Sequence, residues 1–361
     1  MIYQKRKREE ELKTRTYYFT FLAVVLIGSQ ISFSCTSFVL KADKTLLFGS
    51  NYDNDVWPGM LCVNKKNVKK TGWEPGMTGE IAEWVSEYGS VTFNAAGYQL
   101  AWAGINEKGL VMSTMALGET KNPEPDERSP LVSALWMQYI FDTCATVDEL
   151  IATDKIVRIK DTVDHYLVCD ASGDAAVIEF LDGKMVVHRQ KSLPIKALAN
   201  RVYSECVSEW REGIPKDINR SKSRMARVEE KLSDFDPNGK ILPAAYAFEI
   251  LDDVSSPPYT RWSIVFDIQN RTIHFKTYEN QDERRIDLKK IDYSCETPAM
   301  MMDVHADLKG DITDAFEEID QEYSLHHLIR FLKESEIEMP EEQVKMLFNL
   351  FVNFPCTSEK K

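Results

Sequence analysis

The amino-acid sequence predicts an α+β fold built from layers of sheet and helix, with two sheets. Segments rich in β-branched and aromatic residues, which favour strands, occupy the N-terminal third and return at residues 165–188 and 261–276. Segments whose apolar residues have helical spacing lie between these groups and after them. Strands and helices grouped in this way are typical of sheets covered by helical layers.

Strands account for most of the N-terminal third. Residues 36–41 and 45–48 flank a polar turn and predict a β-hairpin with Cys35 at its first position. Further strands are expected at residues 89–93, 99–103 and 110–115, the last after a turn at Asn106–Gly109.

The middle of the chain predicts a pair of helices followed by an antiparallel sheet. Apolar residues at helical spacing indicate helices over residues 131–143 and 146–153. Three strand-like segments joined by polar turns come next, at residues 165–169, 176–180 and 184–188.

The last third predicts two helices, two strands that complete the core, and a helical extension. The helices are expected at residues 223–232 and 244–251, and the strands at 261–266 and 272–276. Beyond them the chain becomes charged, and its apolar residues keep helical spacing at Leu325, Leu328, Ile329, Leu332, Val344, Leu347, Phe348 and Phe351. We therefore expect one main domain over 35–294 and a helical extension, 295–361, packed on its core.

Composition excludes several classes of function. The 361 residues carry a formal net charge of −13, whereas a nucleic-acid binder needs a basic surface to displace counterions. The seven cysteines include no Cys-x-x-Cys pair, and the six histidines form no His-Glu-x-x-His pattern, so we expect neither a metal nor a cofactor. The odd number of cysteines leaves at least one thiol unpaired, and spacing does not determine which cysteines pair.

The first 34 residues have the order of a secretory signal. A basic stretch precedes an apolar run at residues 17–28, and the small residues Ser32 and Ser34 come directly before Cys35. The run is shorter than the ~20 residues that span a bilayer comfortably, so we expect cleavage before Cys35 and a periplasmic or extracellular protein. Two alternatives stay open: an uncleaved membrane anchor, and a lipoprotein, although Ser32 stands where a lipoprotein usually has leucine.

Cleavage before Cys35 would place an α-amine and a thiol on one residue. An α-amine titrates near pH ~7.7–8 and a thiol near ~8.5, so the amine can take the thiol proton at neutral pH. Attack on an amide carbonyl would give a thioester, which water then hydrolyses. The alternatives are that Cys35 only begins an edge strand, or that it is the lipid acceptor of a lipoprotein.

Several short motifs occur in the order of one enzyme family. They are CTSF at 35–38, FGSNYD at 48–53, GINEKGL at 104–110, LAN at 198–200, SKSRMAR at 221–227 and TRW at 260–262. In these motifs the chain, over roughly residues 35–290, resembles the choloylglycine hydrolase and penicillin V acylase family of N-terminal-nucleophile hydrolases. The resemblance implies a four-layer αββα fold with two antiparallel sheets between helical layers, no cofactor, and a small amide substrate. It also implies a possible homo-oligomer.

The resemblance assigns roles to four side chains. It implies that Cys35 is the nucleophile and that the Asp53 carboxylate holds its α-amine. It implies that the Asn200 amide donates to the oxyanion, a kind of contact whose loss typically costs ~2.7–4 kcal/mol of barrier. It places Arg224 near the nucleophile, where a fixed positive charge favours thiolate.

Two positions depart from the family pattern. Ser50 stands where the family has an arginine three residues before the aspartate, and the loss of that cation removes one source of thiolate stabilisation. Ala116 stands where relatives carry asparagine or tyrosine as the second oxyanion contributor, a role that its backbone N–H can still fill. Apolar residues that would suit an acyl group are Tyr52, Trp57 and Met60.

We thus expect an exported hydrolase that cleaves a linear amide C–N bond through an N-terminal cysteine thioester. Bile salts, penicillin V and N-acyl amides are the substrates that the resemblance implies, and the sequence does not choose among them. A catalytically weak or inactive binding protein, a lipoprotein anchored through Cys35, and an acyltransferase of the same fold are the alternatives. The only membrane contact expected of the cleaved protein is that of its signal segment before cleavage.

Overall fold

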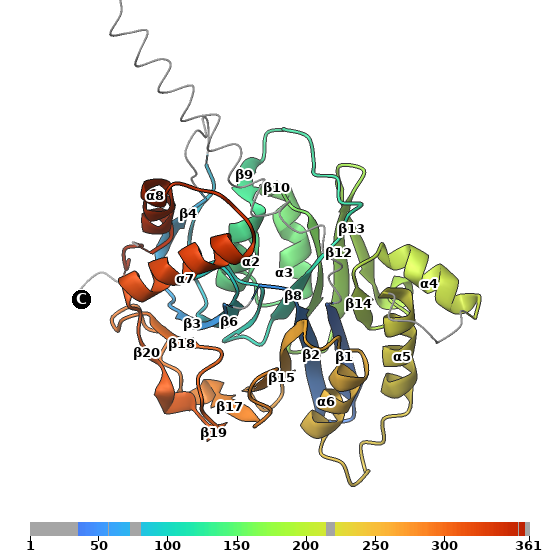
Figure 1. Ribbon diagram of the computed structural model, residues 1–361. Helices are drawn as coiled ribbons and strands as arrows, with labels where there is room; N and C mark the ends of the chain where they lie inside the picture. The colour runs from blue at the N-terminus through green and yellow to red at the C-terminus, as the bar shows by residue number, and fades with distance from the viewer. Residues whose placement is uncertain (1–34, 57, 73–80, 214–220, 353, 358–361) are drawn as a thin grey trace, which may run out of the picture.

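The chain is described by a computed structural model over residues 35–56, 58–72, 81–213, 221–352 and 354–357. The expected signal segment and Trp57 lie outside these described residues. Two large sheets lie face to face with helices on their outer sides, so the described chain has an αββα arrangement (Figure 1). This confirms the predicted α+β fold with two sheets between helical layers.

The first sheet contains the hairpin that begins after Cys35. Its seven strands, in spatial order, are β14 (Ala197–Ala199), β1 (Thr36–Ala42), β2 (Thr45–Asp53), β15 (Thr260–Asp267), β16 (Thr272–Thr277), β17 (Arg284–Asp287) and β19 (Gly310–Asp311). β1 pairs antiparallel with β2, with Thr36 opposite Asn51. On its other side β2 pairs with β15, which brings Thr260 opposite Asp53. Segments from both ends of the predicted main domain therefore meet beside Cys35.

The second sheet has nine strands and lies against the first. In spatial order they are β13 (Lys184–Arg189), β12 (Ala175–Leu181), β11 (Asp164–Cys169), β8 (Val111–Ala116), β7 (Ala103–Asn106), β6 (Ser90–Asn94), β3 (Met60–Asn64), β18 (Met300–Asp303) and β20 (Glu317–Glu318). Every residue of β3 and β6 is buried, because both faces of these strands are covered.

Helices cover the outer sides of both sheets. α5 packs on β14 and β1, and α6 packs on β2 and β15, whereas α2 contacts β7 of the second sheet. No helix in the described ranges is long and apolar enough to cross a membrane. The helices are α2 (Ser133–Thr143), α3 (Val147–Ala152), α4 (Tyr203–Arg211), α5 (Ser221–Ser233), α6 (Pro243–Asp253), α7 (Gln321–Glu334) and α8 (Glu341–Val352).

Short elements complete the chain. Two small two-stranded sheets pair β4 with β5 and β9 with β10. Their bounds are β4 (Lys69–Thr71), β5 (Glu83–Val85), β9 (Ser129–Val132) and β10 (Val157–Lys160), and 3-10 turns cover Thr153–Lys155, Gln190–Ser192, Leu288–Lys290 and Thr313–Ala315.

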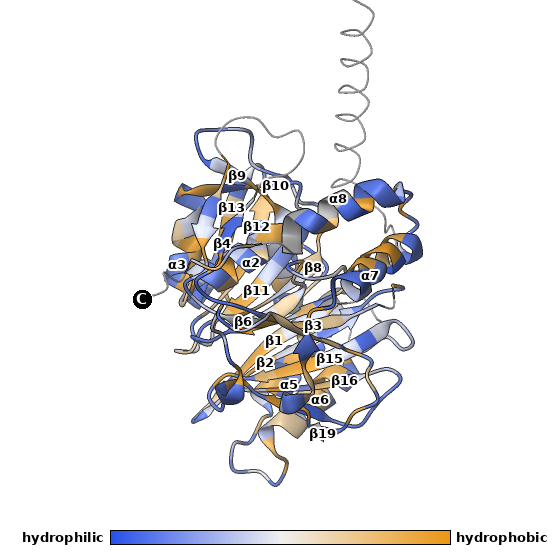
Figure 2. Ribbon diagram, turned by 90° about the vertical axis from the view of Figure 1, so that its left-hand side faces the viewer, coloured by the Kyte–Doolittle hydropathy of each residue, from blue (hydrophilic) through white to orange (hydrophobic). Residues whose placement is uncertain are grey.

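Two apolar clusters hold the layers together. The larger lies between the sheets, where Phe266 contacts Phe48 and Phe93 edge-on with ring centroids 6.1 Å apart. The second joins the second sheet to its helices, and it includes Trp136 of α2 and Leu328 of α7. In Figure 2 the strands between the layers are largely hydrophobic, whereas the helices carry long hydrophilic stretches. Burial of the sheet faces therefore fixes the distance between the layers.

One strand prediction in the N-terminal third was wrong. The expected strand at 99–103 begins only at Ala103, as β7. Gly97 and Gln99 have φ values of 133° and 67°, so the chain turns there and cannot continue extended. The pattern of apolar residues did not predict this turn.

Two other predictions need correction. The helix expected from residue 131 begins at Ser133, because residues 129–132 form β9, which pairs in parallel with β10. The extension 295–361 is helical only in its second half. Its first half contributes β18 and β20 to the second sheet and β19 to the first.

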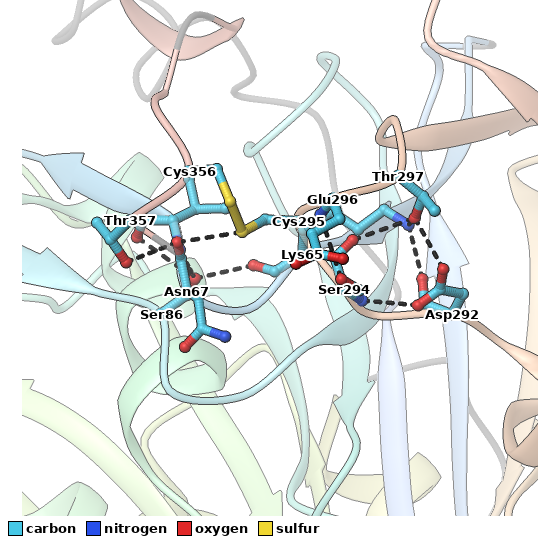
Figure 3. The surroundings of a disulfide bond; sticks show 11 residues. Lys65, Asn67, Ser86, Asp292, Ser294, Cys295, Glu296, Thr297, Cys356 and Thr357 are labelled. Atoms are coloured by element: carbon cyan, nitrogen blue, oxygen red, sulfur yellow. Dashed lines mark hydrogen bonds between the residues drawn. A yellow bond between two sulfur atoms is a disulfide. The ribbon is translucent and has the colours of Figure 1, made fainter. Parts of the chain in front are cut away.

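A disulfide links the two ends of this extension. Cys295 and Cys356 are bonded across a sequence separation of 61 residues, and the other five cysteines are free and buried. The backbone of Cys356 pairs with that of Val68 in an isolated antiparallel β-bridge. The Thr357 N–H donates to the Asn67 carbonyl at 2.7 Å (Figure 3). The last described residues are therefore fixed to the N-terminal half of the chain.

Candidate active site

Cys35 lies at the start of β1, with its side chain in the apolar interior between the sheets. The residue is 3 % exposed. The Asp53 N–H donates to Cys35 Sγ at 3.4 Å, and the thiol donates to the Asp53 carbonyl oxygen at 3.5 Å. The antiparallel register of β1 and β2 thus brings the thiol against the last residue of β2.

Asp53 carries a buried carboxyl group that lacks partners. The residue is 1 % exposed, and neither carboxylate oxygen has a hydrogen-bond partner among the described residues. Burial raises the pKa of Asp53 to about 6, and the neighbouring Thr260 and Arg224 offset this only in part. An ionised Asp53 would gain from a cation placed against it.

Arg224, on α5, binds two of the other predicted site residues, Cys35 and Asn200. It is 2 % exposed, and its Nη1 donates to the Cys35 carbonyl and to Thr36 Oγ1, both at 2.6 Å. Its Nη2 donates to Asn200 Oδ1 at 3.2 Å. Burial lowers the pKa of Arg224, opposed by the charges of Asp53 and Cys35, but arginine remains charged at neutral pH.

Asn200 follows β14 and reaches across to the second sheet. β14 pairs with β1 so that Ala199 lies opposite Thr36, which places the next residue beside Cys35. Asn200 Nδ2 donates to the Ala116 carbonyl at 3.1 Å, at the end of β8. The structure therefore brings Cys35, Asp53, Asn200, Arg224 and Ala116 together, as the sequence predicted. Their catalytic roles stay predictions.

The thiol of the full-length chain is held neutral. Burial and the charge of Asp53 raise the pKa of Cys35 well above its usual range, and the Asp53 N–H and the Arg224 charge lower it by less. A cation close to both Cys35 and Asp53 would offset the charge of Asp53 and so lower the pKa of Cys35.

Serine hydroxyls line the position where the family arginine is missing. Ser37 shares hydrogen bonds with Ser50 at 2.9 Å and with Ser113 at 2.6 Å, and all three side chains are fully buried. This chain of hydroxyls joins the two sheets without adding charge. The link to Ser113 of β8 could not be found from sequence, because it depends on how the sheets pack.

Asp164 is a second residue that sequence reasoning missed. It lies on β11 directly opposite Ala116. Burial raises the pKa of Asp164 to about 7, although the nearby Thr114 hydroxyl acts to lower it, and the charge of Asp164 in turn raises the pKa of Cys35. Only the pairing of β8 with β11 places Asp164 near the site, because no sequence motif surrounds this residue.

The three predicted acyl-group contacts fall in different places. Tyr52 is 2 % exposed and stacks on Trp262 with ring centroids 4.0 Å apart, and half-buried Trp102 meets it edge-on at 4.7 Å. Met60 is fully buried in a separate small cluster with Cys62 and Met301. Trp57 lies outside the described residues. The substrate role of these three residues stays a prediction, and Trp102 is the aromatic residue of this group with exposed surface.

No group of three or more His, Cys, Asp or Glu side chains within the described ranges could hold a metal ion. The geometry instead offers a thiol, a carboxyl, an amide and a guanidinium around Cys35, the residue directly before β1. This combination suits nucleophilic attack on a carbonyl without a metal.

A family comparison agrees with this geometry. The model of the family described as acyl-coenzyme A:6-aminopenicillanic acid acyl-transferase matches residues 41–288. The chain belongs to this family. The match covers well over half of the chain and includes every predicted site residue except Cys35, which lies six residues before it.

The individual proteins that are similar to this chain include penicillin V acylases and a bile acid hydrolase. Penicillin V acylase from Pectobacterium atrosepticum is 25 % identical over 346 residues, covering 80 % of this chain and 89 % of that protein. The structure of penicillin V acylase from Agrobacterium tumefaciens matches with a TM-score of 0.70 and 24 % identity, over 79 % of this chain and 98 % of that one.

The conjugated bile acid hydrolase from Clostridium perfringens, solved as a variant, matches with a TM-score of 0.65 and 17 % identity, over 76 % of this chain and 99 % of that one. These structures show that the αββα arrangement is the N-terminal-nucleophile hydrolase fold. The predicted resemblance to choloylglycine hydrolases and penicillin V acylases is confirmed, and the chain is an enzyme of the linear amide C–N hydrolase kind.

Proposed function

We propose that the enzyme hydrolyses a small linear amide with Cys35 as nucleophile, after removal of residues 1–34 has made Cys35 the mature N-terminus. The observation that carries this proposal is the buried Asp53 carboxyl group, neither of whose oxygens has a hydrogen-bond partner among the residues that the structure describes. A buried ionised carboxylate without a partner costs several kcal/mol. The α-ammonium group of a freed Cys35, on the residue whose thiol already contacts Asp53, would supply the missing cation and donors.

The first half of the reaction forms a thioester. The α-amine takes the thiol proton, Sγ attacks the amide carbonyl carbon, and the carbonyl oxygen becomes an oxyanion. The C–N bond then breaks, and the α-ammonium group returns the proton to the leaving nitrogen. Asp53 keeps the α-amine beside Sγ in this scheme, while Arg224 holds the Cys35 carbonyl and Asn200 in place.

The oxyanion would be stabilised by the Asn200 amide and the Ala116 N–H. Asn200 is restrained from two sides, by Arg224 at its Oδ1 and by the Ala116 carbonyl at its Nδ2. A donor held this way needs little reorganisation as negative charge develops, which is the source of its catalytic effect.

The second half releases the acid. The α-amine takes a proton from water as the water attacks the thioester carbon, and the thiol leaves as the C–S bond breaks. Acid and free Cys35 result, so the cycle needs no cofactor.

The substrate class follows from the relatives and from the chemistry of the site. Penicillin V and conjugated bile acids are the compounds that the relatives' names suggest as first substrates. Ser50 removes a cation from this site, and the buried hydroxyls that replace it carry no charge. We therefore propose acyl amides in general as the substrate class.

We also propose that the protein is exported and acts in the periplasm or outside the cell. The Cys295–Cys356 disulfide supports this, since structural disulfides form in oxidising compartments. Lipid attachment to Cys35 is the competing outcome, and it would block the α-amine that the mechanism requires.

The decisive experiment is intact mass and N-terminal sequencing of protein isolated from the cell envelope or medium, before and after iodoacetamide. We expect a mature terminus at Cys35, one alkyl group on that residue, and loss of amide hydrolysis with it. Cys35→Ala should lower kcat/KM at least ~10³-fold, as expected for loss of a covalent nucleophile. The matched control Cys206→Ala removes another buried free thiol and should keep activity. A blocked or upstream terminus in active protein would contradict the proposal.

Acyl transfer is a second candidate function, favoured by the acyl-transferase description of the family. A thioester can be attacked by an amine in place of water, giving a new amide. Adding 6-aminopenicillanic acid to the hydrolysis assay and measuring the ratio of amide product to free acid would separate the two. A ratio that does not rise with amine concentration excludes transfer to this amine.

A further inference from the structure

Glu179 of β12 is a buried charged residue, and it is far in sequence from every predicted site residue. Its side chain and that of His165, the residue opposite it on β11, have no exposed surface, and His188 of β13 is 15 % exposed. β14 and α4 lie beside β12 and β13 in the fold (Figure 1). The carboxylate is therefore enclosed between the second sheet and the segment that carries Asn200.

Three groups bind this carboxylate. Oε1 shares a hydrogen bond with His165 Nδ1 at 3.1 Å and accepts one from the Tyr203 N–H at 2.9 Å. Oε2 shares one with His188 Nε2 at 3.1 Å. Tyr203 is the first residue of α4, whose N-cap, Val202, makes no side-chain cap. Glu179 thus caps α4 from another element and places a negative charge at the positive end of the helix.

Tyr203 also closes the segment before it into a loop. Its hydroxyl donates to the Ile195 carbonyl at 2.7 Å and accepts from the Ile195 N–H at 3.2 Å. Its ring packs against His188 with centroids 4.8 Å apart. β14 and Asn200 lie inside this loop, whose last residue, Tyr203, is bound to Glu179.

We propose that Glu179, held by His165 and His188, is a positioning residue that fixes Asn200 against Ala116 for oxyanion binding. The inference rests on the proposed function, since it gives Asn200 the oxyanion role. The carboxylate touches neither Cys35 nor Asn200 in the described contacts, so it acts through Tyr203 and the loop from Ile195.

The charge of Glu179 is maintained across the working pH range. Burial opposes ionisation, but the hydrogen bonds from His165 and His188 and from the Tyr203 N–H outweigh it and lower the pKa of Glu179 to about 2. His165 Nε2 is buried without a partner among the described residues, so Nδ1 is the ring nitrogen that binds Glu179. A permanent carboxylate is a better acceptor for three donors than a neutral amide would be.

The test compares Glu179→Gln with Asn200→Ala and with the double variant. Glu179→Gln should lower kcat by ~10-fold to 100-fold with KM changed less than twofold, because the oxyanion forms only in the transition state. If Glu179 acts through Asn200, the double variant should be no slower than Asn200→Ala alone. Multiplied effects of the two single substitutions would overturn the proposal.

Asp142→Asn is the matched control for stability. Asp142 is equally buried, on α2, where it is bound by Lys70, Trp84 and Gln138 away from Asn200. We expect it to lower the melting temperature and leave kcat unchanged. Suppose that kcat is measured well below the melting temperature of Glu179→Gln. A value equal to that of the wild type would mean that Glu179 is only structural.

Two further readouts keep the inference separate from the proposed function. Iodoacetamide should alkylate Cys35 in Glu179→Gln as completely as in the wild type, so a slow variant with an intact nucleophile supports the positioning role. Should Glu179→Gln fail to fold, His188→Gln tests the same anchor from its partly exposed side, with the same expected split between kcat and KM. Activity that survives Cys35→Ala would instead refute the proposed function.

Discussion

At the scale of single residues, the candidate site contains a carboxyl group and a guanidinium that are both almost fully buried. Arg224 donates hydrogen bonds to Cys35, Thr36 and Asn200, whereas the Asp53 oxygens have no hydrogen-bond partner among the described residues. This asymmetry makes the full-length chain a state in which Asp53 lacks its partner and the Cys35 thiol is neutral. The α-ammonium group released by cleavage would change both conditions at once.

Asp53→Asn should therefore stabilise the folded protein before cleavage and destabilise it after cleavage. In a form that keeps residues before Cys35, the pKa of Asp53 is about 6 against 3.8 unfolded, so the folded state binds more protons and stability is lost as pH rises from about 4 to 6. The variant should then be more stable than its parent at pH 8, by up to about 3 kcal/mol at ~1.4 kcal/mol per pKa unit, and nearly equal at pH 4. In the form that begins at Cys35 it should be less stable.

Thermal unfolding of both forms at pH 4 and pH 8 measures this difference. Asp55→Asn, two residues away and half-buried, is the control and should change neither form. Equal destabilisation by Asp53→Asn in both forms would contradict the role of the α-amine.

Asp164 gives a separate prediction for pH dependence. Its pKa is raised to about 7, so it gains negative charge between pH 6 and pH 8, and that charge raises the pKa of Cys35. The ratio of kcat/KM for Asp164→Asn to that of the wild type should rise between these pH values, by a factor on the order of threefold, because Asp164 is the smallest of the influences on the Cys35 thiol. The control Asp161→Asn alters an exposed neighbour at a left-handed φ of 59° that asparagine tolerates. A ratio that stays flat would show that Asp164 does not act on the thiol.

The sequence predicted the residues around Cys35 better than the residues that support them. Asp53 ends β2 and Asn200 directly follows β14, and these two strands flank β1, so both residues lie near Cys35. Ser113, Asp164 and Glu179 depend on strand register in the second sheet and on the packing of two sheets. Neither is encoded in any local spacing, so no motif could have revealed them.

At the scale of elements, the hairpin of β1 and β2 depends on one close approach. Gly49 lies opposite Phe38, and a Cβ atom at Gly49 would overlap the Phe38 ring. Gly49→Ala should destabilise the protein by about 1–3 kcal/mol, the usual cost of overpacking a core. Because Cys35 directly precedes β1 and Asp53 ends β2, activity should fall as well.

Urea unfolding and kcat measured on the same preparations test this prediction. Gly118→Ala is the control, because a Cβ there meets no atom within 4 Å and its φ is not left-handed. It should lie within ~0.5 kcal/mol of the wild type. A Gly49→Ala protein as stable as Gly118→Ala would contradict the close approach.

Element boundaries show why sequence reasoning was partly wrong. Strand propensity at residues 99–103 was real, but the positive φ values at Gly97 and Gln99 divert the chain before it can pair. Residues 129–132 pair with β10 although their apolar spacing continues into α2. In both places tertiary pairing overrode a local pattern.

At the scale of the whole molecule, the disulfide closes a loop over most of the extension. In the chain-entropy description a separation of 61 residues contributes about 4 kcal/mol to stability. Reduction should therefore lower the melting temperature by several degrees, and kcat should change less than twofold. The contacts described for Cys35, Asp53, Asn200 and Arg224 all involve residues before 295.

Thermal unfolding with and without a phosphine reductant measures this effect, and Cys295→Ser/Cys356→Ser is the control. The double variant should unfold like the reduced wild type and should not respond to the reductant. A further shift on reduction of the variant would mean that another pair of cysteines contributes.

The αββα architecture was predictable from sequence, whereas the path of the extension was not. Alternating strands and amphipathic helices indicate layers, and the family motifs specify which layers. β18 and β20 are short and rich in methionine and glutamate, so they carry no strand pattern, and only pairing with β3 makes them strands.

The place of β18 in the second sheet has a consequence for the order of folding during synthesis. Until residues 300–303 have been made, β3 is an open edge whose five residues, Met60–Asn64, are all destined to be buried and include no charge. Such an edge is a template for pairing with another chain, whereas the finished sheet ends in two exposed glutamates on β20. A nascent chain of 294 residues would hold every predicted site residue and still be prone to aggregate. Holding the chain unfolded until its last sixth is available, as export in an unfolded state does, would avoid that intermediate.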